Sequence, residues 1–188
     1  MDSSTFDPRA HVEFRPQFGL LAYLFPGLGH VAQGQRRRGV LIGTGLLGLF
    51  FGGLMVGGID VVDRREDRLW FFAQGLIGPL AFGVDFLHQH HFKVLEPADP
   101  SRRIPAMPRS ALPGEVRDPG ASFFSVEPPR PAMPDAATGQ VPRPPNIKSI
   151  AHMNELGMLF CGVAGMMNLI VMIDAAFPRS RRPKGSTA

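Results

Sequence analysis

Three long apolar stretches of the chain contain no charged residue, and they constrain the fold more than any other feature of the sequence. They run from Val40 to Ile59, from Leu69 to Val84 and from Leu156 to Ile173. A helix needs about 18 or more apolar residues to cross a hydrocarbon core of about 30 Å, a length that the first and third stretches reach and the second approaches. The sequence therefore predicts an all-α integral membrane protein.

The balanced mean hydropathy of the whole chain hides this pattern, because it averages two unlike regions. Most of the 19 prolines lie between residues 88 and 153. That region has no apolar period of either 2 or 3.6 residues, so it cannot bury enough surface to offset the entropy of ordering. We expect a largely disordered, Pro-rich loop there.

The expected architecture is a helical bundle of three or four transmembrane helices. A shorter apolar segment begins at Phe18 and is interrupted by Pro26 and Gly27, so its length also fits a re-entrant segment. The predicted regions are a polar tail (1–17), a membrane region (18–87) made of a helical hairpin (18–61) and a third helix kinked at Pro79 (69–87), the linker (88–153), a C-terminal transmembrane helix (154–177) and a basic tail (178–188).

The turn of the predicted hairpin lies in the stretch YLFPGLGHVAQGQRRRG, residues 23–39. Glycine has no steric penalty at positive φ, so its glycines allow the backbone to bend and to approach other backbone closely. Three arginines then precede the long apolar run, where they suit lipid headgroups. The residues of this structural motif are Pro26, Gly27, Gly29, His30, Gly34 and Gly39.

Glycines spaced four residues apart recur along the second apolar run. The pairs are Gly39 and Gly43, Gly48 and Gly52, and Gly53 and Gly57. This spacing places each pair on one face of a helix, where a neighbouring helix can pack closely. We therefore expect this helix to be packed against, either within the chain or by another protein.

The stretch AYLFPGLGHVAQGQRRRGVLIG resembles the Pro-Gly-x-Gly signature of small bacterial membrane proteins related to the two-transmembrane-helix domain family. Together with the distal stretch ELGMLFCGVAGMMNLIVMIDA, it resembles an uncharacterised bacterial family, a domain of unknown function. The resemblance implies a multi-pass protein of the bacterial cytoplasmic membrane and supplies no activity. Val31, Ala32 and Gln33 stand where such families commonly carry an aromatic residue.

Four polar residues lie in or beside the apolar runs. Asp85 and Asp174 each have apolar neighbours on both sides, and intramembrane acids are costly and often functional. Pairing with a cation at the membrane interface is the simpler hypothesis, and a transport pathway is the alternative. Gln74 and Asn168 lie deeper, where an interhelical hydrogen bond explains them.

Histidines cluster in FLHQHHF, which contains His88, His90 and His91. Imidazole is the commonest transition-metal ligand, so a haem or metal site that also recruits His30 is one hypothesis. However, positions i, i+2 and i+3 do not share one helix face. An interfacial cap on the third helix is the interpretation that we favour, and we expect no cofactor.

No nucleophile elbow and no phosphate-binding Gly-rich loop is found, so the sequence names no enzyme. The net charge of +4 does not reflect a basic face with interleaved aromatics, which argues against nucleic-acid binding. The expected partners are the lipid bilayer and either further copies of the chain or a larger membrane complex. We expect a structural, scaffold or assembly role, with a transporter or channel component and a redox protein as alternatives.

Overall fold

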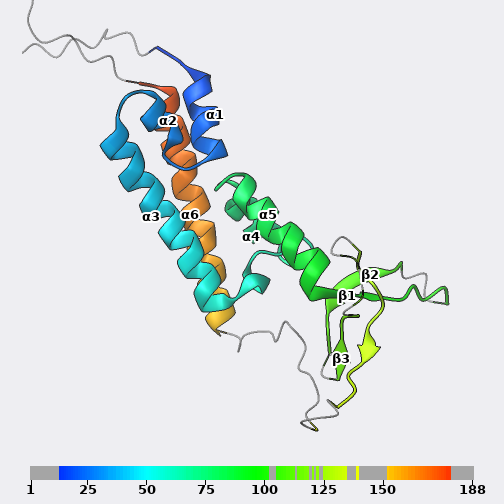
Figure 1. The fold of residues 1–188 in the computed structure, drawn as a ribbon. Coiled ribbons are helices and arrows are strands. Elements are labelled where there is room, and N and C mark those ends of the chain that lie inside the picture. The colour runs from blue at the N-terminus through cyan, green and yellow to red at the C-terminus, as the bar shows by residue number, and fades with distance from the viewer. Residues whose placement is uncertain are drawn as a thin grey trace, which may run out of the picture.

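The computed structural model describes residues 13–101, 105–112, 114–118, 120, 122, 125–134, 139 and 152–178. Two long helices dominate it: α3 (Arg36–Gly57) and α6 (His152–Ala176). They lie side by side and antiparallel (Figure 1). At 1.5 Å per residue, the 22 residues of α3 extend about 33 Å and the 25 residues of α6 about 38 Å. Both are long and apolar enough to cross a membrane.

The two long helices approach closely because glycines face each other at their contact. A Cβ on Gly53 would lie 2.7 Å from the sulfur of Cys161 and from the carbonyl oxygen of Gly157. A Cβ on Gly157 would lie 2.8 Å from the Cα of Gly57. Any larger side chain at these positions would force the helices apart.

The first apolar segment forms two short helices that double back on each other. Helix α1 (Pro16–Leu24) is followed by a turn at Pro26 and Gly27, and then by α2 (Leu28–Ala32). Gly27 has φ +83°, a conformation that favours glycine. Both ends of this first hairpin reach the same end of α6: the Arg15 amide donates to the Ala176 carbonyl (2.8 Å), and the Gln33 side chain donates to the Ala175 carbonyl (2.7 Å).

The segment 69–87 also reverses, and this corrects our expectation of one kinked helix. The structure has α4 (Arg68–Gly75) and α5 (Pro79–Leu87), joined by a turn in which Gly78 has φ +104°. The rings of Phe71 and Phe82 meet with centroids 5.3 Å apart. Proline occupies the first turn of α5, where its missing N–H costs nothing, so it starts a new helix and does not kink an existing one.

The turns of the two hairpins meet beside α6. Gly78 lies directly against the carbonyl oxygen of Tyr23, with no space for a side chain. The buried amide of Asn168 joins both hairpins to α6, donating to the Ala22 carbonyl (3.3 Å) and to the Leu76 carbonyl (2.9 Å). The order of elements thus repeats: a short hairpin precedes each long helix.

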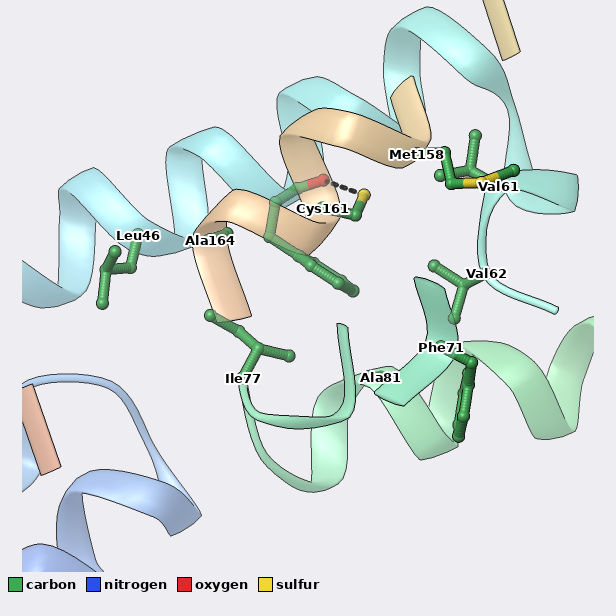
Figure 2. Close-up of a cluster of buried hydrophobic side chains, with 10 residues drawn as sticks. Leu46, Val61, Val62, Phe71, Ile77, Ala81, Met158, Cys161 and Ala164 are labelled. Atoms are coloured by element: carbon green, nitrogen blue, oxygen red, sulfur yellow. Dashed lines mark hydrogen bonds between the residues drawn. The ribbon is translucent and has the colours of Figure 1, made fainter. Parts of the chain in front are cut away.

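The hydrophobic core lies between α3, α6 and the second hairpin (Figure 2). Phe50 and Cys161 are fully buried in it, and the Cys161 thiol donates to the Phe50 carbonyl oxygen at 3.3 Å. The 3-10 helix η1 (Ile59–Val61) closes one end of this core. The buried residues of the cluster are Leu46, Phe50, Val61, Val62, Phe71, Ile77, Ala81, Met158, Cys161 and Ala164.

Beyond α5 the chain forms a π-helical turn and two small antiparallel sheets, which our expectation of a disordered linker did not include. The π-helix η2 (His88–Phe92) leads into β1 (Lys93–Glu96), which pairs with β2 (Met107–Ser110). Strand β3 (Glu115–Val116) pairs with β4 (Arg130–Pro131). The predicted polar tail before residue 13, the basic tail after residue 178 and residues 140–151 of the predicted linker lie outside the described residues.

Candidate functional site

A buried polar cluster lies where α3 ends and the second hairpin begins. We call this end of the long-helix pair the Asp63 end. The cluster combines acids from η1 and the following loop with side chains from α5, η2 and β1. Each side chain is at most 6% exposed. The cluster comprises Asp60, Asp63, Asp85, His88, Gln89 and Lys93.

Lys93 supplies the positive charge of the cluster. Its ammonium is completely buried and contacts a carboxylate oxygen of Asp63 directly, and it lies 3.0 Å from Glu66 Oε1. A buried ammonium without a partner would be strongly unfavourable. Lys93 is the first residue of β1, so this ion pair also attaches the β-hairpin to the helical body.

The two acids nearest the loop 64–66 hold its backbone. Asp85 Oδ1 accepts the backbone N–H of Arg64 at 2.9 Å, and Asp63 Oδ1 accepts that of Arg65 at 2.7 Å. The Gln89 amide donates to the same Asp63 oxygen at 2.8 Å. These bonds fix the loop while leaving both arginine side chains exposed.

The charges within the cluster follow from burial and from Lys93. Burial opposes ionisation of Asp63, but the hydrogen bonds from Lys93 and from the amides of Arg65 and Glu66 outweigh it and lower the pKa of this carboxyl from its ordinary value of 3.8. Burial, followed by the nearby Lys93 charge, lowers the pKa of His88 from 6.5, against the opposing effect of Asp63 and Asp60. At pH 7, Asp63 is therefore ionised and His88 neutral.

Asp60, Asp63 and His88 have ligand-type atoms that all lie within 4.8 Å of one another, a spacing that invites comparison with a metal site. The geometry fits such a site poorly. The closest approaches of His88 use different nitrogens, with Nε2 3.4 Å from Asp60 and Nδ1 3.7 Å from Asp63. Lys93 already occupies the cation position at Asp63. The arrangement is that of a buried ion-pair network.

A second polar cluster lies at the opposite end of the long-helix pair, where α3 begins and α6 ends. Asp174 Oδ2 contacts His30 Nε2 (2.8 Å) and accepts a hydrogen bond from the Arg38 guanidinium (2.7 Å). His30 is 1% exposed. A largely polar cavity of about 400 Å³ adjoins these residues, with Gln33 and Gln35 also in its wall. The cluster joins α2, α3 and α6.

A family model described as "Family of unknown function (DUF6677)" matches residues 18–187. The chain belongs to the DUF6677 family. This confirms the resemblance to an uncharacterised family, whereas a bacterial origin stays a prediction. No curated protein and no solved structure is significantly similar to the chain.

The DUF6677 fold separates the polar residues on which our alternative hypotheses depended. Asp85 lies at the Asp63 end and Asp174 at the other, so they do not face a shared interior. Gln74 donates to the Val61 carbonyl (3.0 Å), and Asn168 to the two hairpins, so both amides serve packing in the chain. These contacts offer no polar pathway between the ends.

The histidines are separated in the same way. His30 contacts Asp174, whereas His88 lies with Asp60 and Asp63 at the far end. His90 stacks on Phe86 with ring centroids 4.2 Å apart, and His91 packs edge-on against Phe92. The convergence of His30 with the 88–91 group that a shared haem or metal site requires is therefore not found among the described residues.

The motif glycines divide into two groups. Gly27, Gly29, Gly39 and Gly43 lie in close backbone contacts around the first hairpin, and Gly53 and Gly57 lie against α6. Gly34 has φ +80° in the turn between α2 and α3. By contrast, a Cβ added at Gly48 or Gly52 would meet nothing within 4 Å among the residues that the structure describes.

Sequence reasoning singled out Asp85 and His88 in the cluster at the Asp63 end, but it missed Asp63, Gln89 and Lys93. These residues lie in three separate segments, and they share no motif. A signal was present in DRREDR, where Asp63 precedes two residues whose amides it accepts. Asp followed by such a run is typical of a local turn that the side chain stabilises.

Proposed function

We propose that this DUF6677 protein is an integral membrane protein whose helices α3 and α6 cross the bilayer. The supporting observation is how little of these helices is buried inside the fold. In the most apolar 18-residue stretch, only 28% of the residues of α3 and 39% of those of α6 are buried. Core helices of a soluble protein would be mostly buried. Here Leu41, Met55 and Ile170 are all more than 60% exposed. Exposing such apolar side chains to lipid costs little free energy, whereas exposing them to water is unfavourable.

In this arrangement the two hairpins enter the bilayer and return to the side they came from. Helices α4 and α5, with 8 and 9 residues, are about 12 and 14 Å long, less than half of a hydrocarbon core of about 30 Å. Non-helical backbone at membrane depth must be buried in protein. The close contact of Gly78 with Tyr23 provides that burial.

The proposed role is assembly through one face of α3. The single observation that carries it is the contrast among the glycine pairs. Two pairs are buried against the chain itself, whereas a Cβ added at Gly45, Gly48 or Gly52 would meet nothing from elsewhere in the described part of the chain within 4 Å. At helical spacing, Gly45, Gly48 and Gly52 share a face, flanked by the exposed side chains of Leu41 and Met55. We call this surface the open α3 face.

The occupant that we propose for the open α3 face is the same face of a second copy. A twofold interface is self-complementary, so exposed Leu41 and Met55 of one copy would fill the glycine grooves of the other. Lipid tails are as apolar as leucine, so close packing at small residues is what favours a helix neighbour over lipid.

Cysteine crosslinking in native membranes tests this role. Cys161 is fully buried, so it contributes little background. We expect Gly48→Cys to form a disulfide-linked dimer under mild oxidation. The double variant Gly48→Leu with Gly52→Leu should abolish dimers in detergent. Leu69→Cys, 89% exposed on α4, is the matched control and should crosslink poorly. Equal crosslinking at both positions, or a monomer that keeps Gly48→Cys reduced, would refute the role.

A further inference from the structure

A pocket of about 260 Å³ opens at the Asp63 end, and neither the membrane placement nor the open α3 face explains it. Its wall combines Arg64 and Arg65 with the aromatic side chains of Phe82, Phe86 and His90. Asp85 and Gln89 line the same pocket and belong to the buried cluster. The pocket thus places two permanent cations beside exposed aromatic surface.

The buried cluster fixes the loop that carries these cations. The amides of Arg64 and Arg65 bond to Asp85 and Asp63, so the loop backbone is held from within the protein. The Arg64 side chain is 62% exposed, and its nearest distance to the Asp85 carboxylate, 3.7 Å, exceeds hydrogen-bond length. The guanidinium therefore keeps its donors available for an external anion.

His90 contributes a third aromatic ring to the pocket wall. Its Nδ1 lies 2.9 Å from the Phe86 carbonyl oxygen, which can only accept, so this nitrogen carries the proton. The ring stacks on Phe86, which holds it in place at the pocket. The π-helical turn of η2 produces this arrangement, and such turns are frequent at functional sites.

The surroundings of the pocket define the rest of the ligand. Phe82 and Phe86 are 44% and 42% exposed, and Trp70 on the neighbouring helix is 42% exposed. Aromatic side chains of this kind are typical of the level at which lipid headgroups meet hydrocarbon. The loop that carries Arg64 and Arg65 also follows α3 and η1 in the chain, at the end of α3 where the proposed crossing reaches that level.

We propose that this pocket binds the phosphate group of a membrane phospholipid, with Arg64 and Arg65 as its donors and with the acyl chains lying over Phe82 and Phe86. Guanidinium groups bind phosphate oxygens in pairs of parallel hydrogen bonds. The Asp85 carboxylate, which lies 3.7 Å from Arg64 Nε, does not prevent this, because two arginines against one acid leave the described wall of the pocket with a net positive charge. The proposal rests on the membrane placement above but not on dimer formation.

Native mass spectrometry of the detergent-purified full chain tests the proposal, with phosphatidylglycerol as the added lipid. We expect one tightly retained lipid. Arg64→Ala with Arg65→Ala should lower its retention about twentyfold, roughly fivefold per arginine. The matched control is Arg68→Ala, which removes the same charge nearby from an exposed residue outside the pocket wall and should change retention less than about twofold.

Further variants and a competitor distinguish a lipid phosphate from a soluble phosphate, and a lost binding contact from a damaged fold. Arg64→Lys with Arg65→Lys keeps the charge and the fold, and we expect intermediate retention because lysine cannot form the paired bonds. Equal loss in the Arg68→Ala control, or no loss in the double alanine variant, would overturn the proposal. Displacement of the lipid by millimolar inorganic phosphate would overturn the lipid as the source and assign the pocket to a soluble phosphate.

Discussion

Asn168 donates a hydrogen bond to the carbonyl oxygen of Leu76 at 2.9 Å, and thereby joins the middle of α6 to the turn of the second hairpin. The same amide reaches Ala22 in the first hairpin. One side chain thus connects three elements, because it donates to the carbonyl oxygens of Ala22, near the end of α1, and of Leu76, in the turn that follows α4. This contact explains why a single polar residue lies deep in an otherwise apolar helix.

Replacing Asn168 by leucine should destabilise the fold by about 1 to 2 kcal/mol, because both hairpins lose a donor in an apolar environment. The measurement is the thermal unfolding midpoint in detergent. Met167→Ala, at the neighbouring position with a 47% exposed side chain, is the control and should shift the midpoint little. Equal shifts of the unfolding midpoint by the two substitutions would show that the hydrogen bonds of Asn168 do not stabilise the fold.

Gly78→Ala should lower the free energy of unfolding more than any other exchange of glycine for alanine in α5 or in the turn before it. Its φ of +104° disfavours a side chain, and the Tyr23 carbonyl occupies the space a Cβ would need. We expect a loss of at least about 2 kcal/mol. Gly83→Ala provides the comparison, since a Cβ there meets nothing within 4 Å. A melting midpoint unchanged by Gly78→Ala would contradict the meeting of the two hairpins.

The ion pair of Lys93 with Asp63 can be tested by a double-mutant cycle in denaturant. Lys93→Met leaves a buried carboxylate without its cation, and we expect a cost of about 3 to 5 kcal/mol. Adding Asp63→Asn should recover part of that loss, because the remaining pair is neutral. Strictly additive effects would mean that the two side chains do not interact.

Acidification should weaken the fold through His88. Its pKa is lowered in the folded protein, so the unfolded chain takes up the proton first, and stability is lost as pH falls below about 6.5. Asp63, whose folded pKa is also lowered, adds a further loss below about pH 4. Unfolding midpoints measured between neutral and mildly acidic pH should fall less steeply for His88→Gln than for the unmodified protein.

The two long helices were predictable because length and lack of charge act locally. The uncharged run from Val40 to Ile59 lies almost wholly within α3 and its C-terminal extension η1, and the predicted segment 154–177 matches α6 closely. Gly53 and Gly57 approach α6 closely, whereas a Cβ at the equally spaced Gly48 or Gly52 would meet nothing within 4 Å in the described part of the chain, so spacing alone does not decide which pair packs internally. The break at Pro26 and Gly27 was also visible, since proline and glycine interrupt helices wherever they occur.

The second hairpin and the buried cluster were not predictable in the same way. A proline within an apolar run fits either a kink or the start of a new helix, and only the reversal at Gly78 decides between them. Asp63 and Lys93 are thirty residues apart and meet only after that reversal has formed. The β-hairpin was equally hidden, because its short strands lie among prolines.

The most direct test of the account is the sidedness of single cysteines in sealed membrane vesicles, in a Cys161→Ala background. Cysteines would replace Arg68 and His91, which flank the second hairpin, and Arg37, at the start of α3. The account predicts that an impermeant maleimide labels the first two from one side and Arg37→Cys from the other. Labelling of Arg68→Cys and His91→Cys from opposite sides would contradict it, as would extraction of the protein from the vesicles by alkaline carbonate.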